Sequence, residues 1–189
     1  MTEKNTTQII ADIISGRRTI HTFRTDSVPS EEIMMRAIEV AKWAPNHHLT
    51  EPWRVYLLGD ETIKGVIDLN TRIMTEKWGA EAARAKQERW SKMPGWLVVS
   101  CNKSDDKLQM QEDYAACCCL IQNLMLYLWS EGIGMKWSTG AVIRDKQFYD
   151  LLWMDPQVEE IVGMFWYGYP DDVPVTVRKP LEQIIVKLP

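Results

Sequence analysis

Apolar residues recur at helical spacing in three stretches of the chain. Over Thr6–Ser15 the isoleucines lie on one side of a helix, and Gly16 marks its expected end. A second helix is predicted with Pro29 in its first turn, where Glu31 and Glu32 favour the positive end of the helix dipole. The third helix is the longest, and we expect it to be central. Its apolar residues alternate at four and three positions: Met110, Tyr114, Cys117, Ile121, Leu124 and Leu128.

Stretches rich in β-branched and aromatic residues predict four strands, at Trp53–Leu58, Trp96–Ser100, Met135–Ser138 and Ile161–Tyr167. A short helix is expected over Asp145–Leu152. Asp60 is the expected cap of a charge-rich helical segment, Ile63 to Trp90, which we interpret as an exposed excursion. The apolar tail, Leu181–Val186, has no partner strand in the sequence. The strand order therefore does not follow, and the pattern alone allows either an α/β or an α+β fold.

Length and composition narrow the class of protein. With 189 residues, 46% of them apolar and 25% charged, the chain predicts one globular domain spanning residues 1–189. The net charge of −4 and the absence of a basic run argue against a nucleic-acid partner. The longest apolar run, Ala115–Met125, is too short to span a membrane, and the first residues carry no export signal. We expect a cytoplasmic protein.

Residues for metal binding or nucleophilic catalysis do not form a recognisable motif. The histidines, at positions 21, 47 and 48, lack ligand spacing, and the adjacent cysteines 117–119 point in different directions on a helix. Cys101 lies in an apolar strand, which disfavours a reactive thiolate. We therefore predict no metal site and no catalytic side chain that forms a covalent bond with substrate.

Two basic pairs offer cations for an anionic ligand. Arg17-Arg18-Thr19 supplies two guanidinium groups and a hydroxyl, the donors that a phosphate monoester would use. Arg178-Lys179 sits between prolines near the C-terminus, where a stiff segment can hold a cation against the same anion. Taken alone, each pair is more simply explained as solvated surface cations.

Polar residues follow the third predicted strand. Trp137, Ser138, Thr139 and Gly140 place hydroxyls and backbone donors at a strand end, where cofactors often bind. An ordinary polar turn explains them equally well. The preceding Gly132-Ile133-Gly134 is no dinucleotide fingerprint, because it comes before a strand instead of after one. Among the nine tryptophans, we expect residues 53, 96 and 166 to fill the core and residues 43, 78, 90 and 137 to be able to face a ligand.

Taken in their order along the chain, these segments resemble those of the nitroreductase family of FMN-dependent NAD(P)H oxidoreductases. The resemblance covers almost the whole chain and is closest to compact members of the family. It rests on the following pieces: Arg17-Arg18-Thr19, Ala44-Pro45-Asn46-His47, Pro52-Trp53, Gly132-Ile133-Gly134, Gly163 to Tyr169-Pro170, and Arg178-Lys179-Pro180-Leu181-Glu182.

The resemblance implies an α+β fold with a mainly antiparallel central sheet flanked by helices. It also implies a homodimer that exchanges C-terminal segments and holds FMN at the subunit interface. By the family pattern, Arg17, Arg18 and Thr19 would hold the phosphate and ribityl chain, with Arg178 as a further contact. Trp43 and His47 would approach the flavin, one of them across the interface. The residues lining the isoalloxazine or its tail would be Trp137, Ser138 and Thr139.

The implied activity is hydride transfer from NAD(P)H through flavin N5 to a small oxidised acceptor, a nitroaromatic or quinone, by a ping-pong mechanism. The flavin carries the chemistry, which accounts for the missing catalytic side chains. A non-catalytic FMN-binding, storage or sensing protein is the alternative. The expected flavin cover is Thr71 to Met93, shaped by Trp78 and Trp90. Thr50-Glu51 departs from the family, many members of which have an amide side chain before Pro-Trp.

Overall fold

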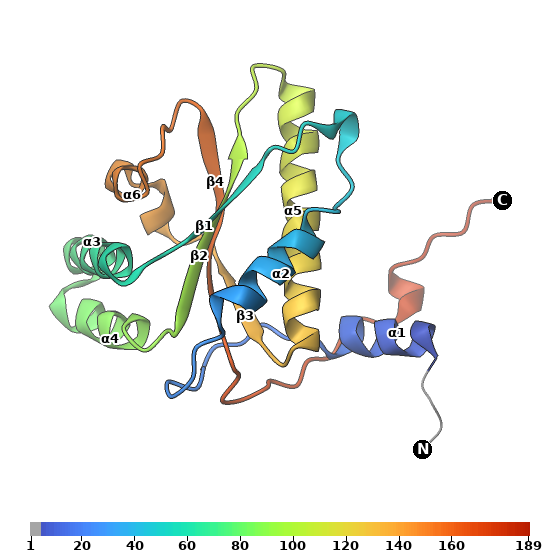
Figure 1. Cartoon of the computed structure of the whole chain (residues 1–189), viewed down its shortest axis with the longest axis horizontal. Coiled ribbons are helices and arrows are strands. Elements are labelled where there is room, and N and C mark those ends of the chain that lie inside the picture. The colour runs from blue at the N-terminus through green and yellow to red at the C-terminus, as the bar shows by residue number, and fades with distance from the viewer. Residues whose placement is uncertain (1–4) are drawn as a thin grey trace.

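The computed structural model describes residues 5–189, which fold around one four-stranded sheet (Figure 1). The strands lie in the order β1-β2-β4-β3, and every neighbouring pair is antiparallel. This confirms the expected α+β class with an antiparallel sheet. The helices and strands have these bounds: α1 Thr6–Gly16, α2 Glu31–Ala41, β1 Trp53–Leu57, α3 Asp60–Trp78, α4 Ala80–Trp90, β2 Gly95–Asn102, α5 Lys107–Ser130, β3 Gly134–Ser138, α6 Lys146–Leu151 and β4 Glu159–Gly168.

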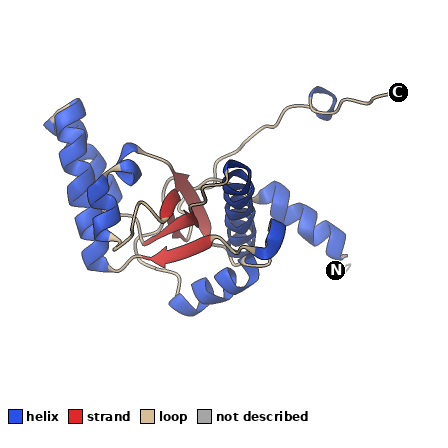
Figure 2. Ribbon diagram, turned by 90° about the horizontal axis from the view of Figure 1, so that it is seen from above, coloured by secondary structure: helices blue, strands red, loops and turns tan. Residues whose placement is uncertain are grey.

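Helices cover both faces of the sheet (Figures 1 and 2). Alternate residues of a strand point to opposite faces, so each face carries its own apolar set. Leu97, Val99 and Phe165 pack with α2 and α5, whereas Trp96, Val98 and Met164 pack on the other face with α3 and α6. The long helix α5 is central to the first cluster, as its apolar spacing predicts.

The residues at the starts of α2 and α3 are not the expected ones. Pro29 precedes α2, and the Ser30 side chain caps the helix by accepting from the Ile33 N–H. Asp60 is the first residue of α3 and not its cap. Gly59 takes the cap position and makes no side-chain bond there. Both expected assignments were therefore wrong by one or two positions, a shift that apolar spacing cannot resolve because it marks the helix interior and not its ends.

The segment between the first two strands is not one exposed helix. Gly79, with φ of 86°, breaks it into α3 and α4, because a glycine takes this left-handed backbone readily. Val66, Leu69 and Trp90 are buried against the sheet. The expected exposed excursion is therefore wrong. Most of the charged residues occupy the outer faces of two helices whose inner faces form part of the core.

The C-terminal segment is not a strand in the single chain. Leu181–Gln183 forms a short 3₁₀ turn, and the apolar side chains from Leu181 to Leu188 are largely exposed. The segment runs away from the sheet in both views (Figures 1 and 2). Within one chain no sheet edge lies beside this segment to supply hydrogen bonds. The expected exchange of Leu181–Val186 with a partner subunit stays a prediction.

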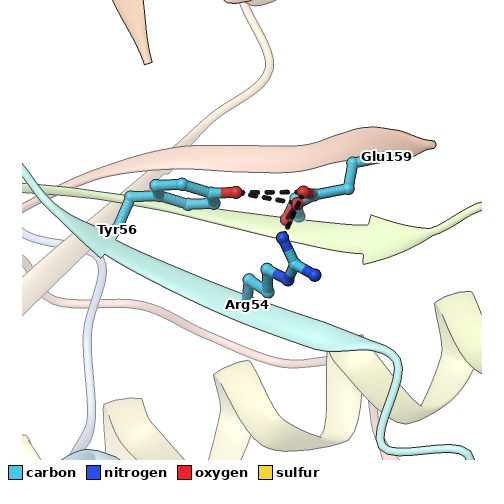
Figure 3. Close-up of polar contacts among 4 residues, drawn as sticks. Arg54, Tyr56 and Glu159 are labelled. Carbon is cyan, nitrogen blue, oxygen red and sulfur yellow. Dashed lines mark hydrogen bonds and ion pairs between the residues drawn. The ribbon is translucent and has the colours of Figure 1, made fainter. Parts of the chain in front are cut away.

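A buried carboxylate ties three strands together at one end of the sheet. Glu159, the first residue of β4, is 3% exposed. It accepts hydrogen bonds from Ser100 Oγ at 2.5 Å and from Tyr56 Oη at 2.9 and 3.1 Å, and forms an ion pair with Arg54 at 2.9 Å (Figure 3). Burial and the Glu159 carboxylate both raise the pKa of Tyr56, so its hydroxyl stays a donor. Sequence reasoning did not single out this group.

Within residues 5–189, no helix combines the length and the apolar character that crossing a membrane requires. Nor do three or more histidine, cysteine, aspartate or glutamate side chains of these residues gather where they could hold a metal ion.

Candidate functional site

The first predicted basic pair is held against the edge strand of the sheet. Arg17 directly follows α1, and the chain then turns so that Thr19 forms a parallel bridge to Met135 in β3. The Ile20 N–H donates to the Met135 carbonyl at 3.1 Å. Gly134 permits this close approach, because a Cβ there would stand 2.2 Å from Ile20. The edge of β3 therefore fixes residues 17–19 in place.

A third guanidinium group lies near enough to this pair for its charge to act on Arg17. Arg17 is half-buried, and burial lowers its pKa, with a further lowering by the charges of Arg178 and Arg18. The structure thus brings Arg178 from the far end of the chain to the first basic pair. Arg18 Nη1 donates to the carbonyls of Ser15 at 2.6 Å and Arg17 at 2.9 Å, which holds it at the end of α1. We call Arg17, Arg18 and Arg178 the arginine cluster.

Across residues 5–189, no carboxylate forms an ion pair with any member of the arginine cluster. Like charges held together without an anion are unfavourable, and a phosphate would relieve them by accepting charge-assisted hydrogen bonds. The Thr19 hydroxyl, exposed beside the cluster, offers one more donor. This donor set fits the phosphate of FMN.

The residues at the end of β3 differ in orientation. Trp137 is half-buried, its indole N–H donates to the Val162 carbonyl at 3.3 Å, and its ring centroid lies 5.2 Å from that of Phe165. Its ring therefore packs on the face of the sheet that α5 covers. Ser138 points to the opposite face, and Thr139 is exposed with its carbonyl bonded by Arg144. Neither the Ser138 nor the Thr139 hydroxyl has a hydrogen-bond partner among residues 5–189, so both are available at the strand end.

Trp43 and His47 lie on a different surface of the single chain. Trp43, 80% exposed, forms part of an apolar groove of about 420 Å³ between α1, α2 and α5. His47 is exposed, and its ring centroid is 3.9 Å from that of His48. Of the nine expected site residues, three lie beside the start of β3 and three at its end, and Arg178 lies near enough to Arg17 for its charge to act there. Trp43 and His47 lie elsewhere.

The loop that carries His47 has a strained backbone. His48, Leu49 and Glu51 all have positive φ, at 60°, 51° and 43°, which is unfavourable for residues with a Cβ. Asn46 Oδ1 accepts the Glu51 N–H at 2.7 Å, and Thr50 Oγ1 donates to the buried Asp113 carboxylate at 2.5 Å. These bonds attach the loop to α5 and offset the strain. Glu51, where many family members carry an amide, has an exposed side chain.

Replacing Thr50 by valine is expected to lower the free energy of unfolding by about 1–2 kcal/mol, because it leaves the buried Asp113 without its short hydrogen bond. Urea denaturation measures the change. Thr50→Ser keeps the hydroxyl and serves as the control. Equal stability of the two variants would show that this bond does not hold the loop.

A second basic group was missed by sequence reasoning. Lys86 Nζ stands 5.2 Å from the ring centroid of Trp90, and Lys136 Nζ stands 5.3 Å from that of Trp166. The two rings are themselves 5.2 Å apart. Arg89, one helical turn from Lys86 on α4, is close enough for its charge to lower the pKa of both lysines. Only the pairing of β3 with β4 sets Lys136 opposite Trp166, which no local pattern reveals.

Trp90, which we expected to present its ring to a ligand, is a core residue instead. It is 2% exposed and packs edge-to-face with Trp96 and Trp166 at centroid distances of 5.5 and 5.2 Å. Its indole is part of the core because α4 turns its apolar side to the sheet. Trp78, at the end of α3, is 64% exposed and remains free to shape a cover.

A further cavity, of about 830 Å³, lies between α3, α6 and the end of β1 and contains none of the expected site residues. Its walls combine Tyr56, Leu69 and Leu151 with the charged side chains of Glu61, Arg72 and Asp150. Trp153 at its rim is 97% exposed. The cavity is separate from the arginine cluster and the end of β3.

Comparisons with known proteins agree with the resemblance seen in the sequence. The model of the nitroreductase family matches residues 14–169. A Bacillus subtilis (strain 168) protein named "Putative NAD(P)H nitroreductase YfhC" is 33% identical over 178 residues, which are 92% of this chain and 91% of that protein.

Solved structures give the same picture. A nitroreductase-like family protein from Bacillus cereus has a TM-score of 0.87 and 30% identity, covering 100% of this chain and 98% of that one. The FMN and NADPH-dependent nitroreductase NfnB from Sphigopyxis sp. strain HMH has a TM-score of 0.78 at 16% identity, covering 95% of this chain and 99% of that one. The second likeness concerns the fold alone.

Proposed function

The chain belongs to the nitroreductase family, and we propose that it is an FMN-dependent oxidoreductase that reduces a small oxidised acceptor with NAD(P)H. The observation that carries the proposal is the arginine cluster, which has no counter-ion in residues 5–189. Arg17 and Arg18 belong to the segment held at the edge of β3, and the charge of Arg178 acts on Arg17. The names of a relative and of a structural neighbour add support, since they refer to NAD(P)H and to FMN.

Each expected residue has a role in this proposal. Arg17, Arg18 and Arg178 hold the FMN phosphate, and the Thr19 hydroxyl contacts the phosphate or the ribityl chain. Ser138 and Thr139 line the isoalloxazine ring. Trp137 positions that strand end through its bond to Val162. The absence of Cβ at Gly163 makes room for the Trp137 indole, since a Cβ there would stand 2.1 Å from its nitrogen.

A homodimer completes the site. Helix α1 buries no residue in the single chain although Ile9, Ile10 and Ile14 are apolar, and the groove beside it is lined by Trp43. An apolar helix face of this kind is stabilised by covering it with a second copy. The exposed apolar C-terminal segment, exchanged between copies, supplies part of that cover. Trp43 and His47 would then approach the flavin of the partner subunit.

Bound FMN would supply hydride transfer at N5 between NAD(P)H and the acceptor. The site would admit the donor and the acceptor in turn, which is a ping-pong order. The protein binds, orients and excludes water. Among residues 5–189 the buried carboxylates are Glu159 and Asp113. Both are engaged in hydrogen bonds that hold strands and a loop, so neither is available as an acid or base.

The visible absorption spectrum of the purified protein tests the proposal. We expect flavin bands that bleach when NADPH or NADH is added without oxygen and return when a nitroaromatic or quinone is added. Bands that neither nucleotide bleaches would support an FMN storage or sensing protein instead. A colourless protein that takes up no added FMN would contradict both functions.

A further inference from the structure

The second basic group lies on the face of the sheet opposite Trp137. Lys136 is the β3 residue before Trp137, and on the pleated strand it shares a face with Ser138. Lys86 and Arg89 reach the same place from α4, within the segment expected to cover the flavin. We call Lys86, Arg89 and Lys136 the lysine cluster. It therefore lies where the expected cover segment comes close to β3.

The lysine cluster has no counter-ion. No carboxylate in residues 5–189 pairs with any of its members, and the hydrogen bond of Lys86 goes to the Met74 sulfur at 3.8 Å. Lys86 and Lys136 are half-buried, and burial is the largest cause of the lowered pKa of each, followed by the neighbouring positive charges. Burying like charges close together is unfavourable, and the cation–π contacts offset only part of that cost.

The two tryptophans below the ammonium groups also lack acceptors. The indole N–H groups of Trp90 and Trp166 are buried, and neither has a hydrogen-bond partner in the described structure. Buried donors without acceptors are rare in folded proteins and often mark a place where a ligand or water belongs. Cations and orphan donors thus lie together in one compact region, and every one of these groups favours an anion.

We propose that the lysine cluster binds the carboxylate of the acceptor, so that the substrates of this chain are small aromatic compounds bearing a negative charge. The inference rests on the proposed function. The FMN phosphate is already matched by the arginine cluster, so the second set of cations is left for another anion. Because the two ammonium groups stand over neighbouring rings 5.2 Å apart, one small anion can bridge them.

The position of the cluster favours the acceptor over the nucleotide. Lys136 lies two residues from Ser138 at the ring-lining strand end. A carboxylate on an aromatic acceptor lies within one ring of the group that is reduced. The 2′-phosphate of NADPH, in contrast, is at the far end of a long dinucleotide from the nicotinamide. An acceptor whose anionic group lies close to its reduced group therefore fits the short separation between the lysine cluster and the end of β3.

The test compares 4-nitrobenzoate with its neutral analogue 4-nitrobenzamide, using the FMN-loaded enzyme and one nucleotide donor. We expect kcat/KM to favour 4-nitrobenzoate by about tenfold, and Lys86→Gln with Lys136→Gln to bring the ratio close to one, as expected for losing charge-assisted contacts. Arg84→Gln is the matched control, because Arg84 is an exposed cation of α4 outside the cluster. It should keep the wild-type ratio.

A binding measurement makes the result independent of turnover. Benzoate, which is not reduced, should change the tryptophan fluorescence of the wild-type protein on titration, and benzamide should not. The double variant should lose this response. A wild-type kcat/KM ratio near one, or equal responses to benzoate and benzamide, would overturn the inference.

Two further outcomes would assign the lysine cluster elsewhere and so also overturn the inference. If the double variant loses FMN while its kcat/KM ratio is unchanged, the cluster serves the flavin. If only the preference for NADPH over NADH changes, it serves the nucleotide phosphate. Failure of NAD(P)H to bleach the flavin would contradict the proposed function, and the benzoate titration would still decide whether the anion site exists.

Discussion

Replacing Arg17 and Arg18 together by alanine is expected to weaken FMN binding by at least about 100-fold, so that the purified protein is colourless. The physical reason is the loss of two charge-assisted donors to a doubly charged phosphate, each contributing about 1.5–3 kcal/mol. Arg178 alone would remain. The same change should leave the stability of the flavin-free protein nearly unaltered, because it also removes repulsion within the arginine cluster.

The measurement is the flavin-to-protein absorbance ratio after purification, followed by titration of the flavin-free protein with FMN. The control is Arg24→Ala with Arg36→Ala. This pair removes the same charge from exposed arginines that are bound to Asp26 at 3.0 Å and Glu32 at 2.7 Å. The control should retain flavin. If the Arg17 and Arg18 variant keeps a full complement of FMN, the phosphate assignment is wrong.

Replacing Glu159 by glutamine is expected to lower the free energy of unfolding by roughly 2–4 kcal/mol. The carboxylate accepts from Ser100, Tyr56 and Arg54, and these groups come from two other strands (Figure 3). An amide of the same shape has one accepting oxygen, and its NH₂ group faces donors. The Ser100 hydroxyl, fully buried, would lose its acceptor. Arg54 contributes less, because its side chain is 60% exposed.

Urea denaturation of the two proteins gives this difference. The matched control is Glu160→Gln, one residue further along β4, where the side chain is exposed. It should change stability by less than about 0.5 kcal/mol. An equally small effect at Glu159 would mean that water replaces its bonds, and that the carboxylate does not hold the three strands together.

Local pattern was sufficient for most of the secondary structure. The spacing of the isoleucines in α1 and of Cys117, Ile121 and Leu124 in α5 reports which face of a helix is apolar, and this is a property of neighbours in sequence. Arg17-Arg18-Thr19 was likewise recognisable because its donors are contiguous. The order of motifs then predicted the family, which the comparisons confirm.

Contacts between distant segments required the tertiary structure. Arg178 joins Arg17, Lys136 comes to lie over Trp166, and Glu159 bonds Tyr56 only because the chain returns to the same sheet. Burial was decided in the same way, since Trp90 and Trp78 occupy similarly charged helices but only Trp90 faces the sheet. Helical and strand periodicity depends on nearest neighbours along the chain, whereas charge clusters and burial depend on which elements pack together.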